Sequence, residues 1–154
     1  MKPWIWLRVG AALQALGAVL HTIASMDSPS RGPAEQSVFA AMQSFRFQIA
    51  GVTRSHWNFY QGYELFITVA FGIFAVLIWQ LSNLSRIEPK RAAPFIVTIL
   101  VAEILWSAIG WEYFFAGPGG MSLLIGACLV AAILGLRKVD QPALQTGRAA
   151  KAGR

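Results

Sequence analysis

The sequence predicts an all-α integral membrane protein, a four-transmembrane-helix bundle with an amphipathic interfacial helix in its first loop. Four apolar stretches are separated by charged loops, and each can cross the roughly 30 Å hydrocarbon core of a bilayer, which takes about 20 helical residues. Only 13% of the residues are charged, against about 25% in a soluble domain. The stretches cover about residues 4–25, 57–81, 92–116 and 119–136.

The 154 residues have room for one membrane domain, residues 1–138, and a basic tail, residues 139–154, that we expect to be disordered. Ten of the 13 lysines and arginines lie near the N-terminus, between the second and third stretches, or in this tail. Because basic residues near helix ends stay in the cytoplasm, we expect both termini on the cytoplasmic side of a bacterial inner membrane. The net charge of +6 follows from this topology and does not indicate nucleic-acid binding.

The first stretch carries Gly10, Gln14, Gly17 and His21 at spacings of four, three and four, which puts them on one helix face. Small residues at this spacing let a neighbouring helix approach closely, so we expect this face to be packed. A cleavable signal peptide is the alternative, but the apolar run exceeds a usual signal core and contains two polar residues. The last stretch repeats the small-residue pattern, and the segment 117–120 predicts a tight turn before it.

The first loop is too long for a simple connection. After a coil rich in serine and proline, Val38, Met42, Phe45 and Ile49 recur at spacings of four, three and four, and Gly51 follows. This pattern predicts an amphipathic helix that ends at the glycine. The helix either rests on the outer membrane surface or folds as a lid over the mouth of the bundle.

One carboxyl lies deep in the predicted membrane. Glu103 is near the middle of the third stretch, where a charge costs roughly 2.5 to 3.5 kcal/mol on insertion scales. It must therefore face the bundle interior, be paired, or be protonated. Gln14 is the expected partner because it lies at a similar depth. Two roles stay open for Glu103, a proton-handling or ligand-binding carboxyl and a structural hydrogen bond between helices.

A second polar group lies near the outer ends of the helices. Offsets of three, four and seven residues place Glu64 on one side of the second helix with Trp57, Tyr60, Gln61 and Thr68. Residues of the first and third helices reach a similar depth. We expect a small-molecule pocket in which a glutamate beside a histidine transfers protons to a lipophilic substrate. Normal anchoring at the membrane interface is the alternative. The candidate catalytic residues are Glu64, His56 and Glu103, and the candidate substrate-binding residues are Arg54, Asn58, Tyr60, Gln61, His21, Glu112 and Gln14.

Metal or haem binding has little support in the sequence. His21 and His56 come from different segments, and no spacing typical of metal or haem ligands joins them. We therefore predict no metal site, and the sequence identifies no cofactor.

The run from Arg54 to Glu64, RSHWNFYQGYE, resembles a segment of a family of small bacterial four-span membrane proteins without an assigned activity. This resemblance implies a four-helix membrane protein and no particular substrate. The same run is more weakly similar to the membrane-associated proteins of eicosanoid and glutathione metabolism, whose segment is Arg-Ala-His-x-Asn-x-x-Glu. Here Ser55 replaces the alanine and Gln61 the glutamate, and the predicted orientation puts the loop outside, whereas that family's glutathione site faces the cytosol.

These observations lead to three functional hypotheses. The first is a small membrane protein that binds or transforms a lipophilic small molecule in a pocket at the outer end of the bundle. The second is a non-catalytic subunit that packs through the small-residue faces against a larger membrane partner or a second copy. The third is a glutathione-linked membrane enzyme. Membrane lipids are expected partners under each of them.

Overall fold

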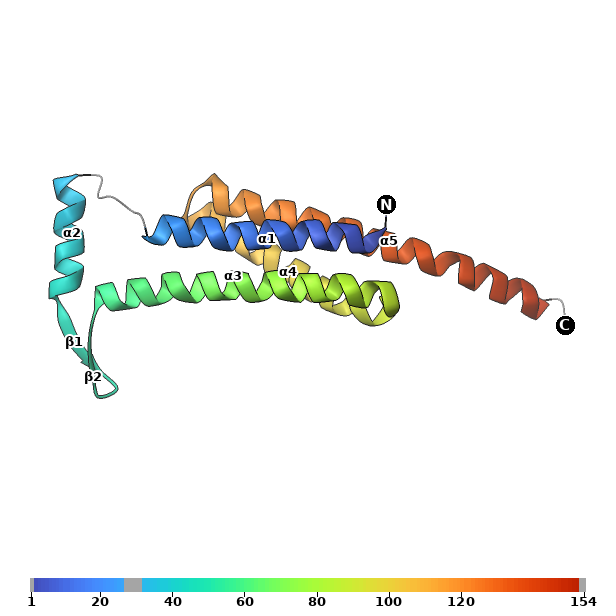
Figure 1. Cartoon of the computed structure of the whole chain (residues 1–154), viewed down its shortest axis with the longest axis horizontal. Helices are drawn as coiled ribbons and strands as arrows, with labels where there is room; N and C mark the ends of the chain where they lie inside the picture. Colours follow the sequence, from blue (N-terminus) through green and yellow to red (C-terminus); the bar gives the residue numbers. More distant parts are fainter. Residues whose placement is uncertain (1, 27–31, 153–154) are drawn as a thin grey trace. The chain divides into compact units, whose positions relative to one another are not determined.

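The computed structural model describes residues 2–26 and 32–152, with side chains up to residue 138 (Figure 1). About 88% of it is helical, and four of its five helices are long and apolar enough to cross a membrane. The elements in chain order are α1 (Pro3–Met26), α2 (Pro33–Ser44), β1 (Arg46–Ile49), β2 (Val52–Ser55), α3 (His56–Ile87), α4 (Pro89–Tyr113) and α5 (Ala116–Ala152). The four predicted spans are thus confirmed as α1, α3, α4 and α5.

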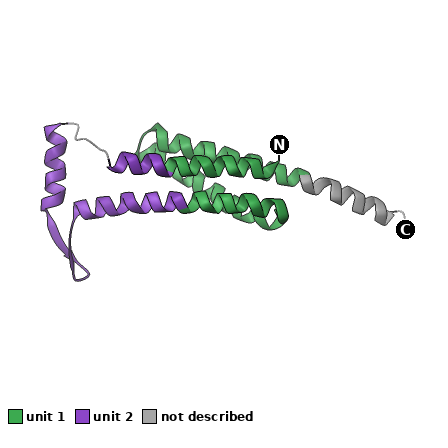
Figure 2. Ribbon diagram, in the orientation of Figure 1, with its two compact units in different colours: residues 1–17, 73–154 green, residues 18–72 purple. Residues whose placement is uncertain are grey.

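The chain divides into two compact units, which Figure 2 shows in different colours. Unit 1 comprises residues 1–17 and 73–154, and unit 2 comprises residues 18–72. Helices α1 and α3 each contribute one part to each unit. We describe the two units separately.

Two predicted connections are shorter in the structure than expected. Only Glu88 separates α3 from α4, because proline is well tolerated at the first helical position and Pro89 starts α4 there. The predicted turn at residues 117–120 is wrong: α4 ends at Tyr113, and these residues form the beginning of α5. Pro118 fits there because the first turn of a helix needs no backbone N–H donors.

The backbone of α5 continues as helix to Ala152, well past the predicted end of the last span. The side chains of residues 139–154 lie outside the described part of the chain. The expected disorder of the tail remains a prediction.

The core of unit 1 is built from all four long helices. Its fully buried side chains include Leu7 of α1, Ile78 of α3, Ile96 of α4 and Leu129 of α5. Helices α4 and α5 approach most closely. A Cβ atom at Gly110 of α4 would lie 2.7 Å from the backbone nitrogen of α5 residue 119, so only glycine fits at this crossing.

Small residues also bring α1 and α5 together within unit 1. A Cβ atom at Gly10 would lie 3.5 Å from Cβ of Cys128, and one at Gly17 would lie 3.8 Å from Cγ of Met121. The expectation that the Gly10 face of the first helix is packed is therefore confirmed, and its neighbour is the small-residue helix at the end of the domain.

Unit 2 contains a β-hairpin where the sequence predicted a continuous amphipathic helix. Helix α2 ends at Ser44, so the expected helical positions Phe45 and Ile49 lie outside it. Strands β1 and β2 pair antiparallel, and the connecting residues Ala50 and Gly51 have φ values of 50° and 80°. Two successive positive φ values are typical of the type I′ turn, whose twist matches that of paired strands. The predicted fold class therefore needs one correction, the addition of this hairpin.

The face that α2 presents to its neighbours also differs from the predicted one. Val38 is exposed, whereas Phe39 is half-buried and its ring lies 5.3 Å from that of Trp57 in α3. Four apolar residues at helical spacing did not determine the packed side, because the rings of α3 offer more contact area to a phenylalanine than to a valine.

Candidate functional site

Within unit 2, one histidine links two helices through both of its ring nitrogens. Nε2 of His21 in α1 lies 3.3 Å from Oε2 of Glu64 in α3. Nδ1 of the same ring lies 3.1 Å from Oγ1 of Thr68, one turn further along α3. We call His21, Glu64 and Thr68 the His21 site. The side chains of His21 and Glu64 are 23% and 26% exposed, so a small molecule can reach them.

The helix geometry explains why these groups meet. Residues four apart lie on one face of a helix, which places Glu64 and Thr68 side by side along α3. The edge of the His21 ring also packs on Phe71, with the ring centroids 5.8 Å apart and the planes at 77°. An apolar wall on one side and two polar partners on the others fix the orientation of the imidazole.

A neutral imidazole gives one consistent set of hydrogen bonds with these partners. With its proton on Nε2, His21 donates to the Glu64 carboxylate, whose oxygens accept. Nδ1 then accepts from the Thr68 hydroxyl, whose oxygen in turn receives the hydroxyl of Thr22 at 3.3 Å. Carboxylate, imidazole and hydroxyl thus stand in the order that activates a hydroxyl or moves a proton in many enzymes.

Tyr60 lies one helical turn before Glu64 on the same side of α3. Its hydroxyl is near enough to the Glu64 carboxylate to interact with it by hydrogen bonding. Its ring stacks on Trp57 with a centroid distance of 5.3 Å. The predicted grouping of His21, Glu64 and Tyr60 at one place is therefore present in unit 2.

Arg54 and His56 do not join this group. Arg54 lies exposed on β2, where its Nη1 donates to the carbonyl oxygen of Thr53 at 3.0 Å. The His56 ring stacks on Phe45 with centroids 5.5 Å apart and an angle of 10°. No hydrogen bond or ion pair connects either side chain to Glu64 in the described part of the chain. The expected convergence of Arg54, His56 and Glu64 is therefore not formed.

Asn58 has a structural role that the sequence analysis missed. Its Oδ1 accepts the backbone N–H of Ser55 at 3.0 Å, and the Ser55 hydroxyl accepts the backbone N–H of Asn58 at 3.3 Å. This reciprocal pair is a capping box at the start of α3. The signal in the sequence was a serine three residues before an asparagine, directly ahead of an apolar run. Gln61 lies exposed on the first turns of the same helix.

Three more candidates lie in unit 1. Glu103 is fully buried and Gln14 is 2% exposed, so the expectation that Glu103 faces the interior is confirmed. The expected hydrogen bond between them is absent: Oε1 of Gln14 and both carboxyl oxygens of Glu103 have no hydrogen-bond partner among the described residues. Glu112 is exposed on the last turn of α4.

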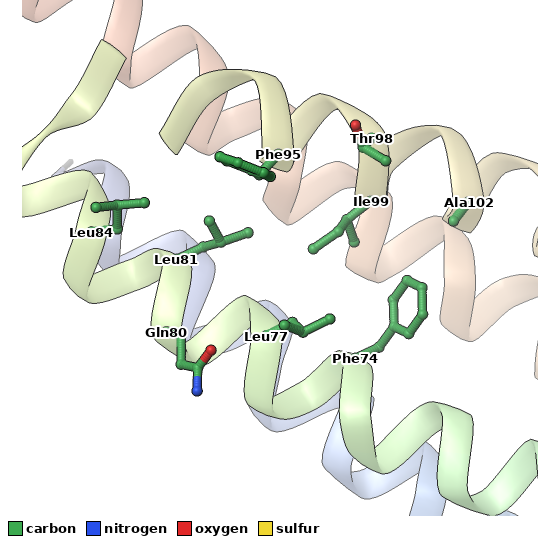
Figure 3. A pocket seen from close by; sticks show the side chains of 9 residues that line it. All are labelled: Phe74, Leu77, Gln80, Leu81, Leu84, Phe95, Thr98, Ile99 and Ala102. Atoms are coloured by element: carbon green, nitrogen blue, oxygen red, sulfur yellow. The ribbon is translucent and has the colours of Figure 1, made fainter. Parts of the chain in front are cut away.

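Unit 1 also contains a half-open apolar cavity of about 430 Å³ between α3 and α4 (Figure 3). Leu77 and Leu81 line it from α3, and Phe95 and Ile99 line it from α4. One end lies beside Phe74, whose ring packs on Trp106 at 4.7 Å. The sequence analysis expected a pocket at the polar mouth and did not identify this apolar one.

The two polar residues of the cavity wall do not make its surface polar. Figure 3 shows the Gln80 amide pointing away from α4 and the gap. The Thr98 hydroxyl donates to the carbonyl oxygen of Pro94 at 3.1 Å. The cavity therefore offers carbon atoms to an occupant, and such cavities take apolar molecules and exclude water.

No group of three or more histidine, cysteine, aspartate or glutamate side chains able to hold a metal ion occurs among the described residues. Thr22 and Thr68 are the members of the polar network that the candidate set lacked. The place of Thr68 on the face of Glu64 was visible in the sequence, but threonine is common in apolar helices and gave no separate signal.

The comparisons with known proteins add no assignment. No family model matches the chain, and no match to a curated protein or a solved structure reaches significance. The two resemblances described for the segment from Arg54 to Glu64 therefore remain expectations.

Proposed function

We propose that this protein binds a lipophilic small molecule with a hydrogen-bonding head group, and that the His21 site holds that head group. The observation that carries this proposal is the hydrogen-bonded series Glu64, His21 and Thr68, which joins two apolar helices. Each polar group in such a helix lowers its preference for the membrane. A structural cross-link needs one bond, whereas this site holds three groups and leaves them partly open.

The chemistry of the site favours a head group with a polar oxygen that accepts the Nε2 proton in a hydrogen bond, such as an alcohol, a phenol or a quinone-type ring. The Nε2 proton and the carboxylate of Glu64 form a donor and an acceptor 3.3 Å apart. A hydroxyl that enters beside them can accept a hydrogen bond from Nε2 and give its own proton to the Glu64 carboxylate, which acts as the base. The proposed activity is therefore binding, with acid–base transfer as the reaction within reach of these residues.

The apolar cavity in unit 1 supports the lipophilic character of the ligand independently. Its volume of about 430 Å³ falls within the usual range of small-molecule sites, roughly 300 to 1,000 Å³. An aliphatic or isoprenoid chain suits its carbon-only lining. A half-open apolar cavity between membrane-spanning helices also has lipid chains as its natural surroundings.

The test uses the full-length protein in lipid nanodiscs and a short-chain quinone as the probe, with quenching of tryptophan fluorescence as the readout. We expect saturable quenching in the wild type and at least tenfold weaker binding in His21→Ala and Glu64→Gln. Ser37→Ala is the matched control, because the Ser37 hydroxyl is bonded within its own helix α2, which contributes no residue to the His21 site or the cavity. Equal binding by all four proteins, or quenching that never saturates, would refute the head-group site.

We further propose that the protein resides in a bacterial inner membrane with both termini in the cytoplasm. The distribution of basic residues supports this topology, since α1 starts among Lys2 and Arg8 and the tail is basic. A phosphatase reporter fused after Arg154, which works only in the periplasm, is expected to be inactive. A reporter inserted at the Ala50–Gly51 turn is expected to be active, and the reverse pattern would overturn the topology.

The two alternative functions have less support. A non-catalytic subunit would need the small-residue faces of the first and last spans for its partner, but Gly10 and Gly17 face α5 within the chain itself. A glutathione-linked enzyme would need Arg54 at the opening of a helix, but Arg54 lies on β2 and bonds its own backbone.

A further inference from the structure

We propose that Glu103 is a proton-binding site in the core of unit 1, separate from the His21 site. In this proposal the carboxyl group carries a proton and donates it to Oε1 of Gln14. The other carboxyl oxygen accepts from the Gln14 amide N–H, so the pair takes up one proton and needs no other ligand.

The first observation is an excess of hydrogen-bond acceptors in a fully buried place. Glu103 is 0% exposed, and neither of its oxygens has a partner among the described residues. Oε1 of Gln14 is also buried without a partner. Carboxylate and amide oxygens only accept, so these three atoms cannot satisfy one another. One added proton converts a carboxyl oxygen into the donor that is missing.

The second observation is that both side chains enter the core at one level of α5. Gln14 lies between Gly10, which faces Cys128, and Gly17, which faces Met121. On α4, Glu103 lies between Leu100, which is next to Gly126 of α5, and Ser107, which bonds to residue 119 of α5. Both positions therefore correspond to residues 121–126 of α5. The proposed bond joins the two side chains at this level.

The polar neighbours at this level are hydroxyls. Ser122 of α5 lies near the Glu103 carboxyl without the geometry of a regular hydrogen bond, and Ser107 of α4 donates to the carbonyl oxygen of residue 119 at 3.1 Å. Both are buried. Cys128 is the titratable neighbour on α5, and the core residues of α3 in this unit carry no charge.

No basic group is available to neutralise the carboxylate from within unit 1. Its lysines and arginines up to residue 138 all lie toward the start of α1 and α4 or the ends of α3 and the described α5. Arg8 is the nearest on α1, about 9 Å along the helix from Gln14. Its guanidinium lies 4.9 Å from the ring centroids of both Trp4 and Trp79, which keep it at that end.

A proton fits this site better than a metal cation. A dehydrated cation needs space for itself and several oxygen ligands around it, whereas a proton adds no volume to a packed core. The core of unit 1 is closed on the α5 side as well, where Ile125 and Leu129 are at most 2% exposed.

Infrared difference spectroscopy on the full-length protein in nanodiscs tests the proposal. The spectrum of the wild type minus that of Glu103→Gln at pH 7 is expected to contain the carbonyl band of a protonated carboxylic acid. Glu112→Gln is the matched control, since Glu112 is exposed on the same helix, and its difference spectrum should contain carboxylate bands instead. Carboxylate bands for Glu103 at pH 7 would overturn the proposal.

Two further measurements test whether Gln14 is the partner of Glu103 and whether sodium occupies the site in place of the proton. Gln14→Leu should move the Glu103 carbonyl band to higher frequency, because a free acid group absorbs above a hydrogen-bonded one. An unmoved band would show that Gln14 is not hydrogen-bonded to Glu103. Replacing sodium by choline in the buffer should change nothing, and a carboxylate that appears only with sodium would show a sodium site in place of the proton site.

Discussion

Glu64 and Glu103 are both single carboxyl groups on long apolar helices, yet their surroundings are opposite. Glu64 in unit 2 is 26% exposed and contacts an imidazole across to another helix. Glu103 in unit 1 is fully buried, and its oxygens have no partner among the described residues. The difference shows that the neighbouring side chains determine the role of a membrane carboxyl more than its presence in a span. A partly open, paired group suits a ligand, and a closed, acceptor-rich site suits a proton.

The largest effect is expected from placing a lysine at each of the two positions. Glu103→Lys places an ammonium in the closed core of unit 1, and we expect a loss of about 3 kcal/mol of stability, or no folded protein. Glu64→Lys should cost clearly less, because that position is partly exposed. Unfolding in mixed micelles, or the folded yield in membranes, measures both. Similar losses of stability at both positions would contradict the difference between the surroundings of Glu64 and Glu103.

An intermediate effect is expected from the ion pair in unit 2. A double-mutant cycle with His21→Ala and Glu64→Ala should give a coupling energy of about 1 kcal/mol, since polar contacts between membrane helices contribute about that much. The cycle with Tyr63→Ala in place of His21→Ala serves as the control, because Tyr63 is exposed. Additive losses for His21 and Glu64 would mean that their contact carries no energy.

A substitution at the start of α3 should destabilise the part of unit 2 that carries Glu64 and leave the surroundings of Glu103 unchanged. Ser55→Ala removes the capping box, and we expect a loss of about 1 kcal/mol. The first turns of α3 should then exchange their amide hydrogens faster, while the amides around Glu103 keep their protection. Ser37→Ala is a suitable control, since the Ser37 hydroxyl bonds only to the carbonyl oxygen of Pro33 within α2. Faster exchange around Glu103 as well would show that the two regions are coupled.

The smallest effect is expected from Glu103→Gln. An amide copies the shape of a protonated carboxyl and its hydrogen-bond donor, so stability should fall by at most about 1 kcal/mol. The unfolding measurement used for Glu103→Lys provides the comparison. A loss as large as that of the lysine variant would mean that the negative charge itself holds the core together.

The spans were predictable because they follow from length and hydropathy alone. Burial of Glu103 was predictable in the same way, from the cost of a charge in lipid. The connections were harder: Pro118 was interpreted as part of a turn, although it stands in the first turn of a helix, where proline fits. The hairpin was missed because an Ala-Gly pair is a weaker turn signal than Asn-Gly, and helical spacing of four apolar residues took precedence.

The candidate site was predictable only in part, because a single sequence gives depth and helix face but not which neighbour a side chain selects. Depth and face brought His21 and Glu64 together correctly. They could not show that His56 prefers the Phe45 ring, or that Asn58 is used by the helix cap. The cavity gave no sequence signal, since it arises where α3 and α4 fail to pack closely, and ordinary leucines and phenylalanines line it.

The β1–β2 hairpin has a practical consequence for imaging so small a membrane protein. Its tip consists of Ala50 and Gly51, and a side chain added at Gly51 would meet no other atom within 4 Å. A short epitope or a rigid fusion partner can therefore be inserted between these residues with its ends held by paired strands. Such a marker would project from the molecule in a defined direction and give a chain of 154 residues the contrast that electron microscopy needs for alignment.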